Sequence, residues 1–121
     1  MSPAAVTRIN PALDMSEDEL LENVVDCAHL FGWRVAHFRA ARSAHGWRTP
    51  VQADGKGFPD LVLAREGDVI FAELKRQKTK LTPEQELWFQ ELFGGQALMV
   101  VWRPSDWVDG TIESALRGEA R

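Results

Sequence analysis

The spacing of apolar residues predicts a helix and a strand in the first third of the chain. Residues 16–31 carry apolar positions every three or four residues, and Ser16-Glu17-Asp18-Glu19 fits a capping box at their start. The sequence therefore predicts a helix that begins after Ser16 and ends at Gly32. Residues 33–38 are rich in strand-forming residues and predict a short strand.

Apolar runs predict three further strands. Residues 60–64 and 69–74 are separated by the turn sequence Arg65-Glu66-Gly67-Asp68, which is the pattern of a hairpin. Residues 97–102 form a continuous apolar run that is typical of a buried strand.

Two helices are predicted in the second half of the chain. Thr82-Pro83 opens the first and Gly94-Gly95 closes it. Residues 111–117 predict a short final helix. The expected apolar stripe of the helix after Thr82 consists of Leu87, Trp88, Leu92 and Phe93.

The elements follow the order α-β-β-β-α-β-α, which predicts an α/β fold with a mixed sheet flanked by helices. Residues 1–14 contain two prolines and no periodic pattern, so we expect a flexible N-terminal arm followed by a single domain over 15–121. Residues 40–58 form a long basic connection, and connections of this length in a small domain are typically functional or mobile.

The charge of the chain is unevenly distributed. The formal net charge is −4, but residues 34–80 hold ten of the fourteen basic residues against five acidic ones, a local charge of +5. A polyanion responds to the field within roughly 10 Å at moderate salt rather than to the sum over the molecule. The acidic balance therefore excludes a general nucleic-acid coat, but it does not exclude a nucleic acid bound at this segment.

Composition excludes several classes of protein. A single cysteine, Cys27, rules out an internal disulfide framework and a multi-cysteine zinc site. The longest apolar run is too short to span a membrane, and residues 1–10 lack the pattern of a signal peptide. We therefore expect a cytoplasmic protein without a membrane partner.

The residues with the clearest chemistry are Asp60, Glu73 and Lys75. Antiparallel pairing brings the start of one hairpin strand beside the end of the other, so the two carboxylates and the carbonyl of Leu74 can converge on a hard cation. Glu73 and Lys75 are two residues apart on a strand and project from one face. An ammonium there can orient a water or neutralise charge on a phosphate. The alternative is a surface Glu73–Lys75 pair on an ordinary hairpin.

These residues resemble a nuclease signature. Pro59-Asp60 followed by Glu73-Leu74-Lys75 resembles the PD-(D/E)-x-K motif of restriction-endonuclease-like proteins. Gly57-Phe58 before it and Leu81-Thr82-Pro83-Glu84-Gln85 with Trp88 after it are similar to the VRR-NUC (virus-type replication-repair nuclease) domain. The resemblance runs from about Ser16 to Asp106 and implies a Mg²⁺- or Mn²⁺-dependent endonuclease, a hydrolase of phosphodiester bonds in DNA, with no small organic cofactor.

The resemblance also implies one further acid from the first helix, and three residues compete for this role. Glu19 is explained by the capping box alone, and Glu22 lies off the apolar stripe. Glu17 shares the face of Leu20 and Val24, where an acid is harder to explain as a solvated side chain. We favour Glu17 as a catalytic residue that binds the metal or supports it through water, with Glu19 and Glu22 as alternatives.

Gln85 has two competing roles. It completes a capping box with Thr82, and in the family this glutamine faces the active site. We include Gln85 among the catalytic residues, with the helix cap as the alternative.

The basic residues around the proposed metal are expected to contact DNA phosphates, which positions a substrate without reading its sequence. The residues with this predicted role are Arg39, Arg42, Arg48, Lys56, Arg76, Lys78 and Lys80.

The resemblance implies a substrate class as well. Stand-alone members of the family resemble homodimeric Holliday-junction resolvases of DNA repair and recombination, and two-fold symmetry suits a junction that needs paired cuts. We expect branched or distorted duplex DNA as the partner, and a bacterial or phage-infected cell as the setting. A flap or nicking endonuclease and a non-catalytic DNA-binding module with this fold are the alternatives.

Overall fold

The structure is a computed structural model that describes residues 10–38, 41–43, 46–48 and 51–119, with the backbone only for 41–43 and 46–48. The elements are η1 (Pro11–Asp14, a 3₁₀ helix), α2 (Glu17–Leu30), β1 (Arg34–His37), β2 (Ala41–Ser43), β3 (Gly46–Arg48), β4 (Leu61–Arg65), β5 (Asp68–Leu74), α3 (Pro83–Leu92), β6 (Leu98–Trp102), α4 (Pro104–Val108) and α5 (Thr111–Arg117). No helix of this described part is long and apolar enough to cross a membrane.

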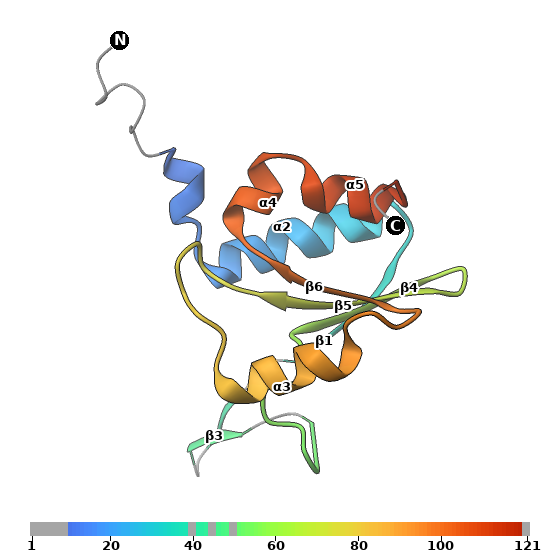
Figure 1. The fold of residues 1–121 in the computed structure, drawn as a ribbon. Coiled ribbons are helices and arrows are strands. Elements are labelled where there is room, and N and C mark those ends of the chain that lie inside the picture. The colour runs from blue at the N-terminus through green and yellow to red at the C-terminus, as the bar shows by residue number, and fades with distance from the viewer. Residues whose placement is uncertain (1–9, 39–40, 44–45, 49–50, 120–121) are drawn as a thin grey trace.

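A four-stranded sheet in the order β1-β4-β5-β6 forms the centre of the molecule (Figure 1). Strands β1, β4 and β5 pair antiparallel, and β6 pairs parallel to β5. Parallel neighbours require a crossover, which α3 provides. The predicted α/β class with a mixed sheet flanked by helices is confirmed.

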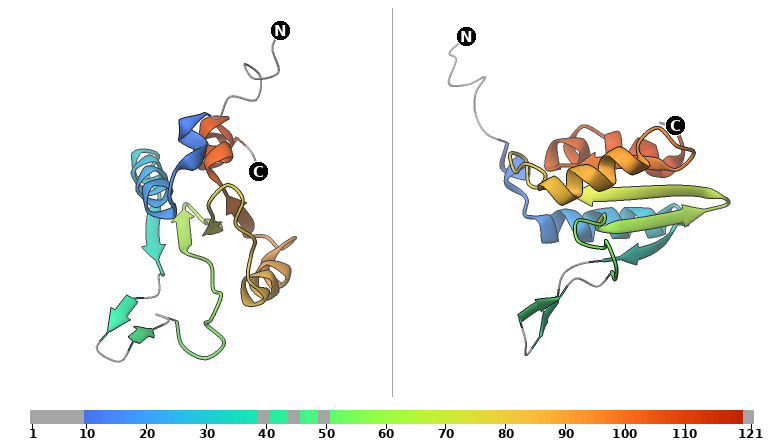
Figure 2. Two further views of the ribbon diagram at one scale, coloured as in Figure 1. Left: turned by 90° about the vertical axis from the view of Figure 1, so that its left-hand side faces the viewer. Right: turned by 60° about the horizontal axis from the view of Figure 1, so that its bottom comes forward.

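The hydrophobic core lies between the sheet and the helices α2 and α5, while α3 lies on the opposite face (Figures 1 and 2). The buried residues of this core include Leu20, Val24 and Ala28 of α2, Leu61, Leu63, Ile70, Ala72 and Leu74 of the sheet, and Ile112 and Leu116 of α5. Because side chains alternate along a strand, burial of Ala72 and Leu74 on the α2 face places Glu73 on the face of α3. The hydrophobic pattern of β5 therefore decides where its carboxylate points.

The predicted hairpin is present as β4–β5, and its turn has two residues rather than the four that separate the predicted strands, because Arg65 pairs with Asp68. Glu66 and Gly67 both have positive φ, 51° and 88°, which matches the twist of the flanking strands. The turn sets the register Leu61↔Ala72, so Asp60 at the start of β4 lies beside the end of β5. The predicted meeting of the two strand ends is confirmed.

Arg65, one of the ten basic residues of segment 34–80, stabilises the fold through contacts with other elements. Its Nη1 donates to the carbonyl oxygens of Phe31 and Leu116, both at 3.0 Å, and its guanidinium lies 4.6 Å from the centre of the Trp33 ring. Trp33 Nε1 donates to the same Leu116 oxygen at 2.8 Å. Arg65 thus fixes the end of α5 and takes no part in the basic surface.

Two segments are more ordered than the sequence predicts. Residues 11–14, assigned to the flexible arm, form η1, which Asn10 caps by accepting a hydrogen bond from Ala12 N at 3.0 Å. The basic connection 40–58 contains the short hairpin β2–β3. Residues 1–9 lie outside the described residues.

The predicted apolar stripe of α3 is partly wrong. Leu87 and Phe93 are 61% and 64% exposed, and no residue of α3 is fully buried. The helix lies against the sheet only along one side, so two of the four stripe positions face solvent. By contrast Trp102 is buried in the core, as the apolar run of β6 predicts.

Candidate active site

Asp60 and Glu73 meet where β4 begins and β5 ends, at one end of the two central strands of the sheet. Asp60 Oδ2 accepts a hydrogen bond from the Leu74 amide at 2.9 Å, which fixes the carboxyl against the end of β5. The side chains of Asp60 and Glu73 lie within hydrogen-bonding reach of each other. Glu73 is only 3% exposed and Asp60 is half-buried, so the pair joins a buried carboxyl group to one that solvent can reach.

The environment of Glu73 strongly favours its protonated form. Burial, the hydrogen bond with Asp60 and the charge of Asp60 raise the pKa of Glu73 to about 10, with a further contribution from Glu17, while the Lys75 charge lowers it. A buried carboxylate this close to a second one is costly to ionise unless a cation offsets the charge. A divalent cation between them would displace the shared proton.

Lys75 lies directly after β5 and is 6% exposed. Its charge acts on Glu73, yet no ion pair involves Lys75 among the residues that the structure describes. A buried ammonium without an ion pair is costly unless a ligand supplies the negative charge. The alternative of a surface Glu73–Lys75 pair does not hold, because both side chains are buried.

Gln85 caps α3 and contacts Glu73 at the same time. Its Oε1 accepts from the Thr82 amide at 2.9 Å, and its Nε2 donates to Glu73 Oε1 at 3.3 Å. The cap requires an oxygen toward the backbone N–H, so the amide nitrogen must point to the carboxyl group. The two roles that the sequence left as alternatives are both present in the geometry.

A substitution at Gln85 separates these two contacts. We expect Gln85→Glu to keep the cap, since a carboxylate also accepts from Thr82 N, but to lose the donation to Glu73 and reduce DNA cleavage by about 10- to 100-fold. Thr82→Ala should cost about 1 kcal/mol of unfolding free energy and leave cleavage near wild type. Equal losses of cleavage in both variants would show that Gln85 acts only through the cap.

Of the three competing acids of α2, Glu17 lies nearest to the site. Its charge contributes to the raised pKa of Glu73, and its side chain is half-buried. Glu19 is exposed and forms the capping box, where its Oε1 accepts from Ser16 N at 3.3 Å. Glu22 is exposed and has no such effect on Glu73. The geometry supports Glu17, whose catalytic role stays a prediction.

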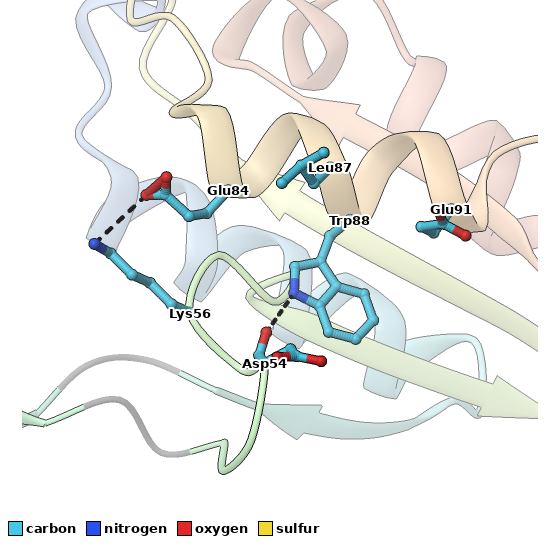
Figure 3. A pocket seen from close by; sticks show the side chains of 6 residues that line it. All are labelled: Asp54, Lys56, Glu84, Leu87, Trp88 and Glu91. Atoms are coloured by element: carbon cyan, nitrogen blue, oxygen red, sulfur yellow. Dashed lines mark hydrogen bonds and ion pairs between the residues drawn. The ribbon is translucent and has the colours of Figure 1, made fainter.

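The loop before Asp60 is fastened to the first turns of α3 (Figure 3). Trp88 Nε1 donates to the Asp54 carbonyl at 3.0 Å, and Lys56 Nζ lies 3.6 Å from Glu84 Oε1. The ring of Phe58 packs edge-to-face on Trp88, with ring centres 5.0 Å apart. Asp60 and Gln85 are therefore held by one connected unit. The sequence marked Phe58 and Trp88 only as parts of a motif and did not predict this contact.

Gly57 is the closest point between that loop and α3. Its φ is +83°, and a Cβ there would lie 2.6 Å from the Glu84 carbonyl carbon and 2.8 Å from Gln85 N. We expect Gly57→Ala to lower the free energy of unfolding by about 2–5 kcal/mol, from backbone strain and overpacking together. Gly67→Ala is the matched control, because Gly67 has φ +88° but no atom within 4 Å of a Cβ, so it should lose only about 1–2 kcal/mol. Equal urea midpoints for the two variants would contradict the close packing.

A pocket of about 280 Å³ opens beside Asp60 and Gln85. It is lined by Phe38, Val51, Gly55, Lys56, Gly57, Phe58, Asp60, Thr82, Glu84 and Gln85.

The predicted DNA-contacting residues fall into three groups. Arg76, Lys78 and Lys80 are exposed immediately after Lys75. Lys56 is exposed but lies within 4 Å of Glu84. Arg39 lies outside the described residues, and so do the side chains of Arg42 on β2 and Arg48 on β3.

The acid pair suits a divalent cation. Mg²⁺ is usually held in proteins by one or two carboxylates together with several waters, and Asp60 and Glu73 supply such a pair. Among the described residues no three His, Cys, Asp or Glu side chains form a group that could hold one ion, and Glu17 as a metal-binding or metal-supporting residue stays a prediction. The side chain of Leu74 lies in the core, and its amide donates a hydrogen bond to Asp60. The role of its carbonyl oxygen as a metal ligand stays a prediction.

Comparison with known proteins agrees with this geometry. The family model of the VRR-NUC domain matches residues 7–103, a stretch that includes the acid pair, Lys75 and Gln85. No curated protein sequence matches the chain significantly. The mixed sheet, the Asp60–Glu73 pair at the ends of its two central strands and the domain match agree, and the chain therefore belongs to the VRR-NUC family of PD-(D/E)-x-K nucleases, with a restriction-endonuclease-like fold.

Proposed function

We propose that this protein is a divalent-metal-dependent endodeoxyribonuclease that cuts branched or distorted DNA as a homodimer. Four-way junctions are its expected substrate, and DNA repair or recombination its expected process. The observation that carries the proposal is the juxtaposition of the Asp60–Glu73 pair with Lys75, a buried ammonium that has no ion pair among the described residues.

Each residue of the site has a defined task in this proposal. Asp60 and Glu73 hold the metal, and Glu17 supports it through water. Mg²⁺ or Mn²⁺ bound there would acidify a water and offset phosphate charge. Lys75 supplies a positive charge to the scissile phosphate or orients the attacking water. Gln85 holds the Glu73 carboxylate in one orientation through its Nε2.

A protein that only binds DNA gains nothing from this arrangement. Acids that face a polyanion weaken its binding, and a buried ammonium adds less to affinity than an exposed one. The burial of Glu73 and Lys75 therefore favours catalysis over the alternative of a non-catalytic binding module.

Cleavage of labelled four-way junction, flap and linear duplex DNA, measured side by side, tests the proposal. We expect Mg²⁺- or Mn²⁺-dependent cuts with the junction preferred, and a dimer in the same buffer by analytical ultracentrifugation. If the flap DNA is preferred, the proposed substrate changes from a four-way junction to a flap, and the proposed metal-dependent hydrolysis stays. Absence of cleavage on all three DNAs with either metal would overturn the enzyme proposal.

A further inference from the structure

The segment that follows Lys75 is held in place by the start of α4. One nitrogen of Arg103, Nη1, donates to three main-chain oxygens of this segment: those of Arg76 at 2.6 Å, Gln77 at 3.3 Å and Thr79 at 2.8 Å. The charge of Arg103 is therefore directed into the segment rather than toward solvent.

A second set of hydrogen bonds fixes the same segment. Gln77 Nε2 donates to Ser105 Oγ at 3.0 Å, and Ser105 N donates to Gln77 Oε1 at 2.9 Å. Arg103 is itself oriented at the start of α4, since its amide donates to Asp106 Oδ2 at 2.9 Å. Residues 76–80 lie outside the regular elements, yet five side-chain hydrogen bonds order them.

The ordered segment presents three cations. Gln77 is turned toward Ser105, whereas Arg76, Lys78 and Lys80 are exposed, and none of the three has an ion pair among the described residues. They follow Lys75 within five positions of the chain. Exposed cations beside a phosphate-cleaving site suit the phosphodiester backbone that leads away from it.

We propose that Arg103 is a positioning residue for DNA: it holds Arg76, Lys78 and Lys80 as a preformed cationic strip and makes no phosphate contact itself. A segment that is already ordered loses less conformational entropy on binding. The inference rests on the proposed function for its ligand, but its test needs DNA binding only.

Binding of fluorescent four-way junction and duplex DNA is measured without divalent metal over a range of salt. We expect Arg103→Lys, which keeps the charge but whose shorter side chain ends one bond short of the Nη1 position that makes the three contacts, to weaken affinity roughly three- to tenfold. The slope of log K against log salt should stay unchanged, because the number of neutralised phosphates is the same. Lys78→Ala should instead lower that slope by about one.

A double-mutant comparison separates positioning from general stability. In the triple variant Arg76→Ala, Lys78→Ala, Lys80→Ala, we expect Arg103→Lys to have no further effect on affinity. Gln77→Ala, which breaks the second set of hydrogen bonds, should also weaken the affinity for DNA in the wild-type background. It replaces Arg103→Lys as the test if that variant fails to fold.

Three results would overturn the inference: wild-type affinity in both Arg103→Lys and Gln77→Ala, an equal loss in the triple-variant background, or a salt slope reduced by about one in Arg103→Lys. If the protein cleaves no DNA but shows the expected binding pattern, the proposed function is wrong and this inference still holds.

Discussion

Lys75→Met should reduce DNA cleavage by about 10²- to 10³-fold and leave DNA affinity within a few-fold of wild type. Methionine fills similar space in the buried position but supplies no charge to the phosphate or the attacking water. We expect Lys75 to add little to the affinity for DNA, because in our proposal phosphate binding rests mainly on the exposed cations of the strip. Single-turnover cleavage at saturating DNA measures the loss directly.

A second effect of Lys75→Met must be separated from the first. The Lys75 charge lowers the pKa of Glu73, so its removal also makes metal binding harder. Rates are therefore compared while Mg²⁺ and pH are raised: weakened metal binding is restored under these conditions, whereas a missing phosphate contact is not. Arg117→Met, which removes an exposed cation on α5, is the control and should cleave as wild type. Unimpaired cleavage by Lys75→Met would refute the role of Lys75.

Without divalent metal, the protein should lose stability as the pH rises from about 5 to 9, with a contribution from Glu73 of up to about 1.4 kcal/mol per pH unit. In the folded state Glu73 keeps its proton, because burial and Asp60 raise its pKa to about 10. In the unfolded chain it releases the proton above its ordinary pKa of 4.5. The stabilisation from this proton is therefore complete below pH 4.5 and is lost as the pH approaches 10.

Urea unfolding in a chelator, repeated across this pH range, measures the effect. Glu73→Gln should abolish the Glu73 contribution, because the amide does not titrate, while Glu113→Gln, the same substitution at an exposed residue of α5, should keep the wild-type slope. Added Mg²⁺ should stabilise the wild type increasingly as the pH rises, since Asp60 and Glu73 would hold the ion better when both are ionised. Identical slopes in wild type and Glu73→Gln would contradict the raised pKa.

The acid pair could be predicted from the sequence because it depends on a local rule. A two-residue turn at Glu66-Gly67 fixes the register of the hairpin, and the register brings Asp60 beside the end of β5. Alternation along β5 then decides which face carries Glu73. Few tertiary contacts are needed for either step.

Gln85 shows the limit of reasoning from one motif at a time. The sequence presents the capping box and the active-site position as alternatives, but an amide has an acceptor and a donor, and Gln85 uses both in the structure. Arg103 could not be predicted, because its three acceptors are main-chain oxygens of a segment about twenty-five residues away in the chain and carry no sequence signal. The exposure of Leu87 and Phe93 could not be predicted either, because it depends on which part of α3 the sheet covers.

The Glu66–Gly67 turn lies at the opposite end of the β4–β5 hairpin from the acid pair (Figure 1). Nothing packs within 4 Å of the Cβ position at Gly67, so the turn is a bare tip rather than a buried corner. The molecule thus has a reactive end and an inert end, separated by the length of one hairpin. We expect that a sequence-specific DNA-binding domain inserted at this tip would leave the acid pair accessible and would direct cleavage to chosen sequences.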